Sequence, residues 1–209
     1  MKEYKTVLRE SSVEYTEKRS KFIGTCKSVV TEPAAIEFIN QIKNKYSGAS
    51  HNVYAYCLRS NQIKRCSDDK EPQGTAGIPA LTVLLNNEVT DTVIVITRYF
   101  GGILLGSRGL VRAYTHCTKL AICASQIVTM ADSFVCRITC NYSQYGPVSS
   151  ILLEFCAVVE DSKFLERVEI VFYIQKDKFE ALSKRLADKT NGQTSAEIVE
   201  EKFLPVSLI

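Results

Sequence analysis

A chain of 209 residues is long enough for two small domains, and its 45% hydrophobic and 23% charged residues are the balance of a folded globular protein. No segment has about 18 uninterrupted apolar residues, which argues against a membrane span. The charged stretch 1–17 lacks the apolar core of a secretion signal. We therefore expect a cytoplasmic protein with no membrane partner.

The net charge of +3 is unevenly distributed along the chain. Residues 1–131 contain 17 Lys or Arg against 11 Asp or Glu, whereas residues 132–209 contain 9 against 12. A mildly basic front half is compatible with a phosphate-bearing partner such as RNA.

The eight cysteines are expected to be reduced thiols, because nothing in the chain indicates export to an oxidising compartment. Cys136 and Cys140 share one face of a predicted strand and are interpreted as small apolar core residues. No C-x-x-C pair occurs, so we expect no zinc site, and the sequence indicates no cofactor.

Segments with alternating or β-branched residues predict strands, and apolar residues three or four apart predict helices. Within 1–131 the predicted elements are a strand at 21–30, a helix capped by Thr31, a strand at 51–58, a helix from Ala80, a buried strand at 92–97 and a long helix after Gly109. Glycine-rich loops are predicted at 68–79 and 98–109.

After a break near Met130–Asp132, the pattern predicts strand, helix, two strands, helix and strand. The order β-α-β-β-α-β is that of a ferredoxin-like split unit. We therefore expect an α+β protein with an N-terminal domain at 1–131 and a ferredoxin-like C-terminal domain at 132–209.

The segment 97–114 runs from the buried strand through four glycines into a helix. Backbone amides at a helix start, next to glycines, can bind a phosphate, and the helix that follows has a basic face. A tight turn with a solvated helix face is the alternative. The candidate binding residues here are Arg98, Tyr99, Gly101, Gly102, Gly106, Arg108 and Arg112, with Lys119 further along the face.

A second candidate is the acidic loop Asp68–Glu71. Its carboxylates could act as acid and base, or they could cap the next helix and pair with an arginine. No metal site is expected, because the spacing of a calcium loop is missing. The candidate residues of this loop are Asp69, Glu71, Gly74, Thr75 and Gly77.

A third candidate is His51, which precedes a strand with Tyr54 and Tyr56 on one face. Aromatic rings beside basic residues can stack on nucleic-acid bases. They can equally pack against a helix of the same domain.

Three segments together resemble the YigZ/IMPACT family: HNVYAY (51–56), DDKEPQGTAGIP (68–79) and TRYFGGILLGSRGLVRAY (97–114). The sequence departs from the family pattern at Leu104, where lysine is common, at Arg108, where a small residue is common, and at Lys70, where glycine is frequent.

The resemblance implies an N-terminal β-α-β fold like that of a ribosomal protein's second domain and of domain IV of elongation factor G, with a left-handed crossover. It also implies a C-terminal domain like domain V of that factor. The eukaryotic relatives act in translational control, by competing for an activator of a stress-responsive initiation-factor kinase.

Two main hypotheses for the function follow. The first is a non-enzymatic, translation-related regulatory factor that binds RNA, the ribosome or a ribosome-associated partner through the glycine-rich, basic surface of the N-terminal domain. The alternative is a hydrolase-type enzyme with a cleft formed by His51, Asp68–Glu71 and the 101–109 loop. A third possibility is an interaction module that uses the acidic C-terminal sheet.

Overall fold

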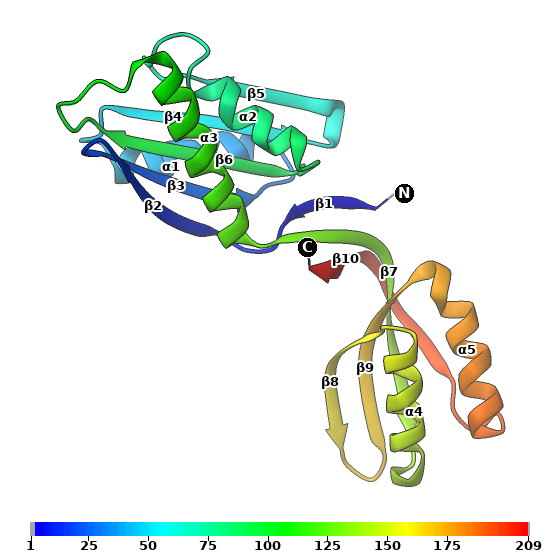
Figure 1. Ribbon diagram of the computed structural model, residues 1–209. Helices are drawn as coiled ribbons and strands as arrows, with labels where there is room; N and C mark the ends of the chain where they lie inside the picture. Colours follow the sequence, from blue (N-terminus) through cyan, green and yellow to red (C-terminus); the bar gives the residue numbers. More distant parts are fainter. Residues whose placement is uncertain (1–2, 209) are drawn as a thin grey trace. The chain divides into compact units, whose positions relative to one another are not determined.

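The computed structural model of the protein describes residues 3–208 (Figure 1). The chain divides into two compact units, a larger one over Tyr4–Thr129 and a smaller one over Met130–Ser207. Each unit combines one antiparallel sheet with helices, so the predicted α+β class is confirmed. None of the helices in the described part of the chain is long and apolar enough to cross a membrane.

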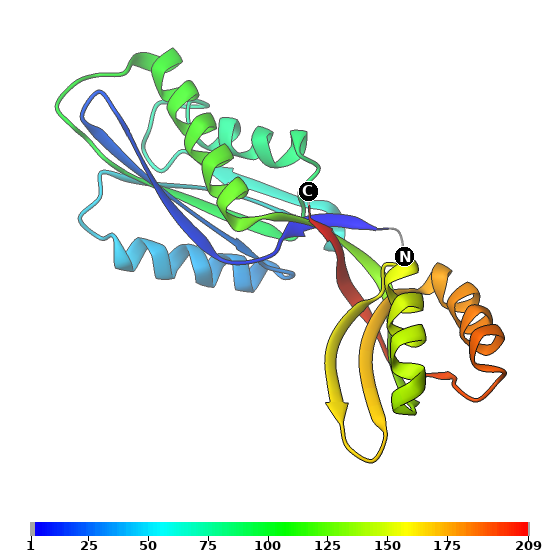
Figure 2. The ribbon, with the colours of Figure 1, turned by 60° about the horizontal axis from the view of Figure 1, so that its bottom comes forward.

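The larger unit is built on a five-stranded sheet in the order β2-β3-β6-β4-β5, in which every neighbouring pair is antiparallel. Its strands are β2 (Ser11–Glu17), β3 (Ser20–Ser28), β4 (His51–Leu58), β5 (Ile63–Ser67) and β6 (Thr92–Tyr99). Helix α1 (Glu32–Lys45) covers one face, and helices α2 (Gly77–Asn86) and α3 (Gly106–Ser125) cover the other (Figures 1 and 2). A short strand, β1 (Tyr4–Val7), and a 3₁₀ turn, η1 (Ser60–Gln62), complete this unit.

Strand β6 is the centre of the core, because it is covered on both faces. Ile94 and Ile96 pack with α2 and α3, whereas Val93 and Val95 pack with α1, and all four are fully buried. Burial on both faces explains the uninterrupted β-branched run from which a central strand was predicted. The structure confirms that strand and extends it to Tyr99.

Several elements differ from the expectation: β1 was not predicted, and helix α3 begins at Gly106 rather than after Gly109. Helix α2 begins at Gly77, three residues earlier than predicted, with Pro79 in its first turn, where proline is tolerated. Strand β2 was not predicted, because only Val13 and Tyr15 of its seven residues pack against the core. It is an edge strand, and its polar residues follow from that position.

Gly24 in β3 lets helix α3 approach the sheet closely. A Cβ atom at this position would lie 2.9 Å from Cys117 Sγ and 3.1 Å from Ala121 Cβ. The small residues of α3 therefore pack directly on the glycine, which fixes the distance between helix and sheet.

The smaller unit has the element order β7 (Ile127–Cys140), α4 (Tyr142–Glu154), β8 (Val158–Phe164), β9 (Val168–Gln175), α5 (Lys176–Thr190) and β10 (Ala196–Leu208). The strand order in its sheet is β1-β7-β9-β8, and β10 also pairs with β7. Alternate residues of β9 are buried, because the two helices pack on one face of the sheet. Cys136 and Cys140 lie in this core, as expected of small apolar residues.

We predict that Gly24→Ala destabilises the protein by about 1 to 3 kcal/mol, because the added methyl overpacks the contact between β3 and α3. Gly48→Ala is the matched control, since a Cβ atom there meets nothing within 4 Å. Urea unfolding followed by circular dichroism measures both. Equal midpoints for the two variants would contradict the proposed close packing.

Candidate functional site

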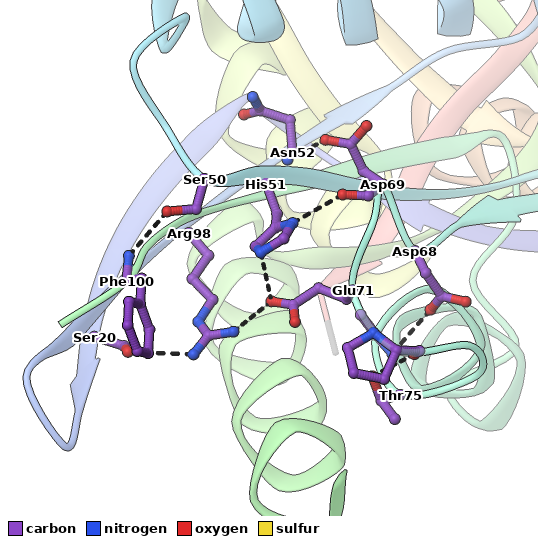
Figure 3. Close-up of polar contacts among 12 residues, drawn as sticks. Ser20, Ser50, His51, Asn52, Asp68, Asp69, Glu71, Thr75, Arg98 and Phe100 are labelled. Carbon is purple, nitrogen blue, oxygen red and sulfur yellow. Dashed lines mark hydrogen bonds and ion pairs between the residues drawn. The ribbon is translucent and has the colours of Figure 1, made fainter. Parts of the chain in front are cut away.

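One end of the larger unit's sheet brings the three motif segments together. In the antiparallel register His51 lies opposite Arg98, and Tyr54 lies opposite Ser67, so β4 begins where β5 and β6 end. The acidic loop after β5 and the glycine-rich loop after β6 consequently start on either side of the beginning of β4 (Figure 3). Segments that are far apart in the sequence therefore lie at the same end of the sheet.

The buried carboxylate of Glu71 is the centre of the contacts at this end. Its Oε1 atom accepts hydrogen bonds from Arg98 Nη1 at 2.6 Å and from the Tyr114 hydroxyl at 2.8 Å. His51 Nε2 lies 3.7 Å from the same oxygen. Burial, reinforced by the neighbouring Glu71 charge, raises the pKa of the Tyr114 phenol, which therefore stays protonated and donates.

Arg98 differs from the expectation that it belongs to an exposed basic face. The residue is only 5% exposed, and its charge is compensated inside the protein by Glu71. Its Nη2 atom also donates to Ser20 Oγ at 3.3 Å, and Gly101 N donates to the same oxygen at 3.2 Å. Arg98 thus fastens the acidic loop and the start of the glycine-rich loop to β3.

The carboxylate of Asp68 caps the N-terminus of α2. It accepts hydrogen bonds from the backbone amides of Gly74 at 2.8 Å, Ala76 at 3.0 Å and Gly77 at 2.8 Å. The Thr75 hydroxyl donates to the Pro72 carbonyl at 2.6 Å. The amides of this glycine loop are therefore satisfied by the protein's own anion, which removes them as a site for an external phosphate.

Asp69 joins the acidic loop to the start of β4. Its Oδ2 atom accepts from Asn52 N at 2.6 Å, and its backbone oxygen lies 2.9 Å from His51 Nδ1. Lys43 Nζ is 3.6 Å from its other carboxylate oxygen. All three acids of the loop thus make contacts within the fold. These contacts match the interpretation that the acids cap the next helix and pair with an arginine. None of the three carboxylates lies in an open cleft.

Lys70 follows Asp69 with a φ of 71°, in the left-handed region that favours glycine. This positive φ explains why glycine, which the family resemblance implies at this position, is favoured here. The lysine side chain is exposed.

Tyr54 does not face the glycine-rich loops. It packs against the α1 side of the sheet, and its ring stacks on Tyr56 with centroids 6.3 Å apart. Lys43 Nζ lies 5.5 Å from the ring centroid of Tyr54. Tyr54 therefore packs within its own domain, which was the alternative to stacking on a base. Of His51, Tyr54 and Tyr56, only His51 lies near Glu71.

The glycine-rich loop contacts the turn between β2 and β3. A Cβ atom at Gly101 would collide with the backbone of Arg19, so no other residue fits there without a shift. Gly102 and Gly106 have φ values of 81° and 70°, and open space surrounds both. Tyr99 is half-buried and pairs with Lys21 in the sheet, and Leu104 is 82% exposed at the loop.

Two sides of α3 differ in what they face. Gly109 and Arg112 line a hollow of about 360 Å³ with Lys18 from the β2–β3 turn. Val111 and Lys119 instead face α2. Arg108, Arg112 and Lys119 are exposed, and within residues 3–208 none of them forms an ion pair.

The sequence analysis missed Lys18 and Arg19, because it did not predict β2 and hence the turn that presents them. Both residues are exposed and have φ values of 46° and 65°. The sequence did contain a signal for this turn, namely a Lys–Arg pair between two segments with alternating residues. Among the described residues, no group of three His, Cys, Asp or Glu side chains could hold a metal ion.

These features define a two-unit α+β protein whose larger unit holds a buried Arg–Glu pair beneath two glycine-containing loops. Residues 18–122 match the Impact N-terminal domain, and residues 138–193 match a domain of unknown function, DUF1949. The chain belongs to the IMPACT family, as its motifs predicted.

Some relatives match nearly the whole chain, and others match less than half of it. The IMPACT family member YvyE of Bacillus subtilis is 34% identical over 96% of this chain and 93% of its own length. The Protein IMPACT homolog of Dictyostelium discoideum is 39% identical over 44% of this chain and 28% of its own length. A crystal structure of a hypothetical protein superimposes with a TM-score of 0.60 at 27% identity, covering 97% of this chain and 100% of that one.

We predict that Glu71→Gln lowers the free energy of unfolding by about 3 kcal/mol, because it leaves the Arg98 charge buried without a counter-charge. The control is Glu88→Gln, which removes an exposed partner of Lys5 and should change stability little. Chemical denaturation of both variants tests this. A small effect at Glu71 would mean that the cluster does not determine the fold at this end.

Proposed function

We propose that the protein is a translation-related regulatory factor that binds RNA, free or within the ribosome, through a basic surface of its larger unit. This basic surface consists of Lys18, Arg19, Arg108 and Arg112. The observation that carries the proposal is that these four exposed cations have no ion pair within the described residues.

Exposed cations without an internal partner favour an external anion. Arg112 and Lys18 line one hollow together with Glu17. Arg108 lines the neighbouring one with Arg112, so Arg112 connects the two hollows. Arg19 follows Lys18 in the β2–β3 turn. Polyanion binding gains free energy when such cations displace the counterions condensed on phosphates. The basic surface therefore suits RNA better than an uncharged ligand.

The backbone beside the basic surface adds donors for phosphate. No side chain caps the start of α3, so its first amides lack the kind of partner that Asp68 provides for α2. Open space around Gly102 and Gly106 would let a phosphate approach these amides.

Family membership supports a role in translation. The Dictyostelium relative and Protein IMPACT-A of Xenopus tropicalis each match 97 residues, which is 44% of this chain. The eukaryotic members act in translational control, so a shared domain with an exposed cationic surface is consistent with a shared type of partner.

The test is co-sedimentation with purified ribosomes and binding to mixed RNA at about 50 and about 200 mM salt, over which phosphate-driven binding weakens roughly tenfold or more. Arg108→Glu/Arg112→Glu should abolish most of this binding. Lys184→Glu/Lys189→Glu is the matched control, because it makes the same charge change on two exposed lysines of α5.

Three outcomes would contradict the proposal. Binding that does not respond to salt would exclude phosphate contacts as its source. Equal loss in the control variant would indicate a general charge effect. Binding that survives ribonuclease treatment would identify a protein partner instead.

A further inference from the structure

We propose that the groove between α2 and α3 docks an acidic, amphipathic helix of a partner protein. This α2–α3 groove has a volume of about 610 Å³ and lies on the side of α3 that faces away from the β2–β3 turn (Figure 1). It is therefore a second surface, which meets the proposed RNA contact at Val111, because this residue also lines the hollow of Arg108 and Arg112.

Apolar side chains from both helices form the groove. Ile78 and Pro79 contribute from α2, and Val111 contributes from α3. Ile78 is 55% exposed and Val111 is 37% exposed, although both belong to helices that are packed on the core. Water-exposed branched side chains that face each other across a groove gain free energy when another apolar side chain covers them.

The charge of the groove is positive and uncompensated. Lys119 is the charged residue among those that line it, and no carboxylate lines it. Arg108 and Arg112 line the adjoining hollow together with Val111, and none of the three cations forms an ion pair within residues 3–208. An occupant with apolar residues on one face and acidic residues beside them complements both properties.

A protein helix fits these observations better than RNA does. Besides Gly74 and Lys119, the described lining residues are aliphatic side chains, threonines and asparagines, and none of them has an aromatic ring on which a base could stack. An extended strand would need a free sheet edge, whereas two helices present a groove that accepts a third helix through residues at i, i+3, i+4 and i+7.

The groove is also preformed. Asp68 holds the first turn of α2 through three backbone amides, and Glu71 accepts a hydrogen bond from Tyr114 of α3. Both walls are thus tied to one acidic loop, so little conformational entropy would be lost when a partner binds.

The experiment is selection from a displayed library of random 16-residue peptides, followed by fluorescence anisotropy with the enriched peptide on the full-length protein. We expect enriched sequences with apolar residues three or four apart and flanking Asp or Glu. Ile78→Ser and Lys119→Glu should each weaken the binding about tenfold or more, as substitutions at interface anchors do.

Matched controls lie on α1, across the sheet from the groove (Figure 2). Ile36→Ser replaces an isoleucine that is 47% exposed, and Lys45→Glu reverses an exposed lysine, so both should leave peptide binding unchanged. Circular dichroism confirms that each variant is folded.

The outcomes separate this proposal from the function proposed above. Ile78→Ser should retain salt-dependent RNA binding while losing the peptide, whereas Arg112→Glu should reduce RNA binding. Three results would overturn the groove proposal. The selection could enrich basic peptides or no peptide at all, or Ile78→Ser could leave the affinity for the enriched peptide unchanged. The third result is a dimer of the chain, detected by sedimentation, that Ile78→Ser dissociates, because the groove would then bind a second copy of the chain.

Discussion

The buried pair of Glu71 and Arg98 determines how the end of the larger unit that holds the three motif segments is arranged. Glu71 belongs to the acidic loop, Arg98 is the last residue but one of the central strand, and Tyr114, which donates to the same carboxylate, belongs to α3. Desolvating two charges is costly, and the short, hydrogen-bonded geometry offsets that cost only when all three segments are in place. The position of α3, and with it both surfaces of this helix, depends on that carboxylate.

Much of the fold followed from local sequence patterns. The β-branched run at 92–97 predicted a doubly covered strand, and the alternating and helical patterns predicted most of the other elements. Specific motifs identified the family, because their residues recur in a fixed order over more than sixty positions. Those predictions depend on local periodicity or on long motifs, and both can be recognised in a single sequence.

The pairing of distant residues could not be read from the chain. Arg98 follows a buried strand in the sequence and resembles a surface residue, and only the loop that returns Glu71 to its side makes it a core residue. For Asp68 the sequence left two interpretations open, a catalytic acid or a helix cap, and the structure selects the cap: its partners include the amide of Gly77, where a helix starts nine residues later. Polar side chains gain their roles from tertiary neighbours, and local patterns do not encode those neighbours.

The helical period of α3 separates two neighbouring positions by about 100°. Val111 consequently faces α2, while the adjacent Arg112 faces the β2–β3 turn. Replacing Val111 leaves the cations of the other flank in place, so selection can change the apolar lining of the groove while the basic surface keeps its charge. Relatives with the same scaffold could therefore diverge in one molecular association while preserving the other.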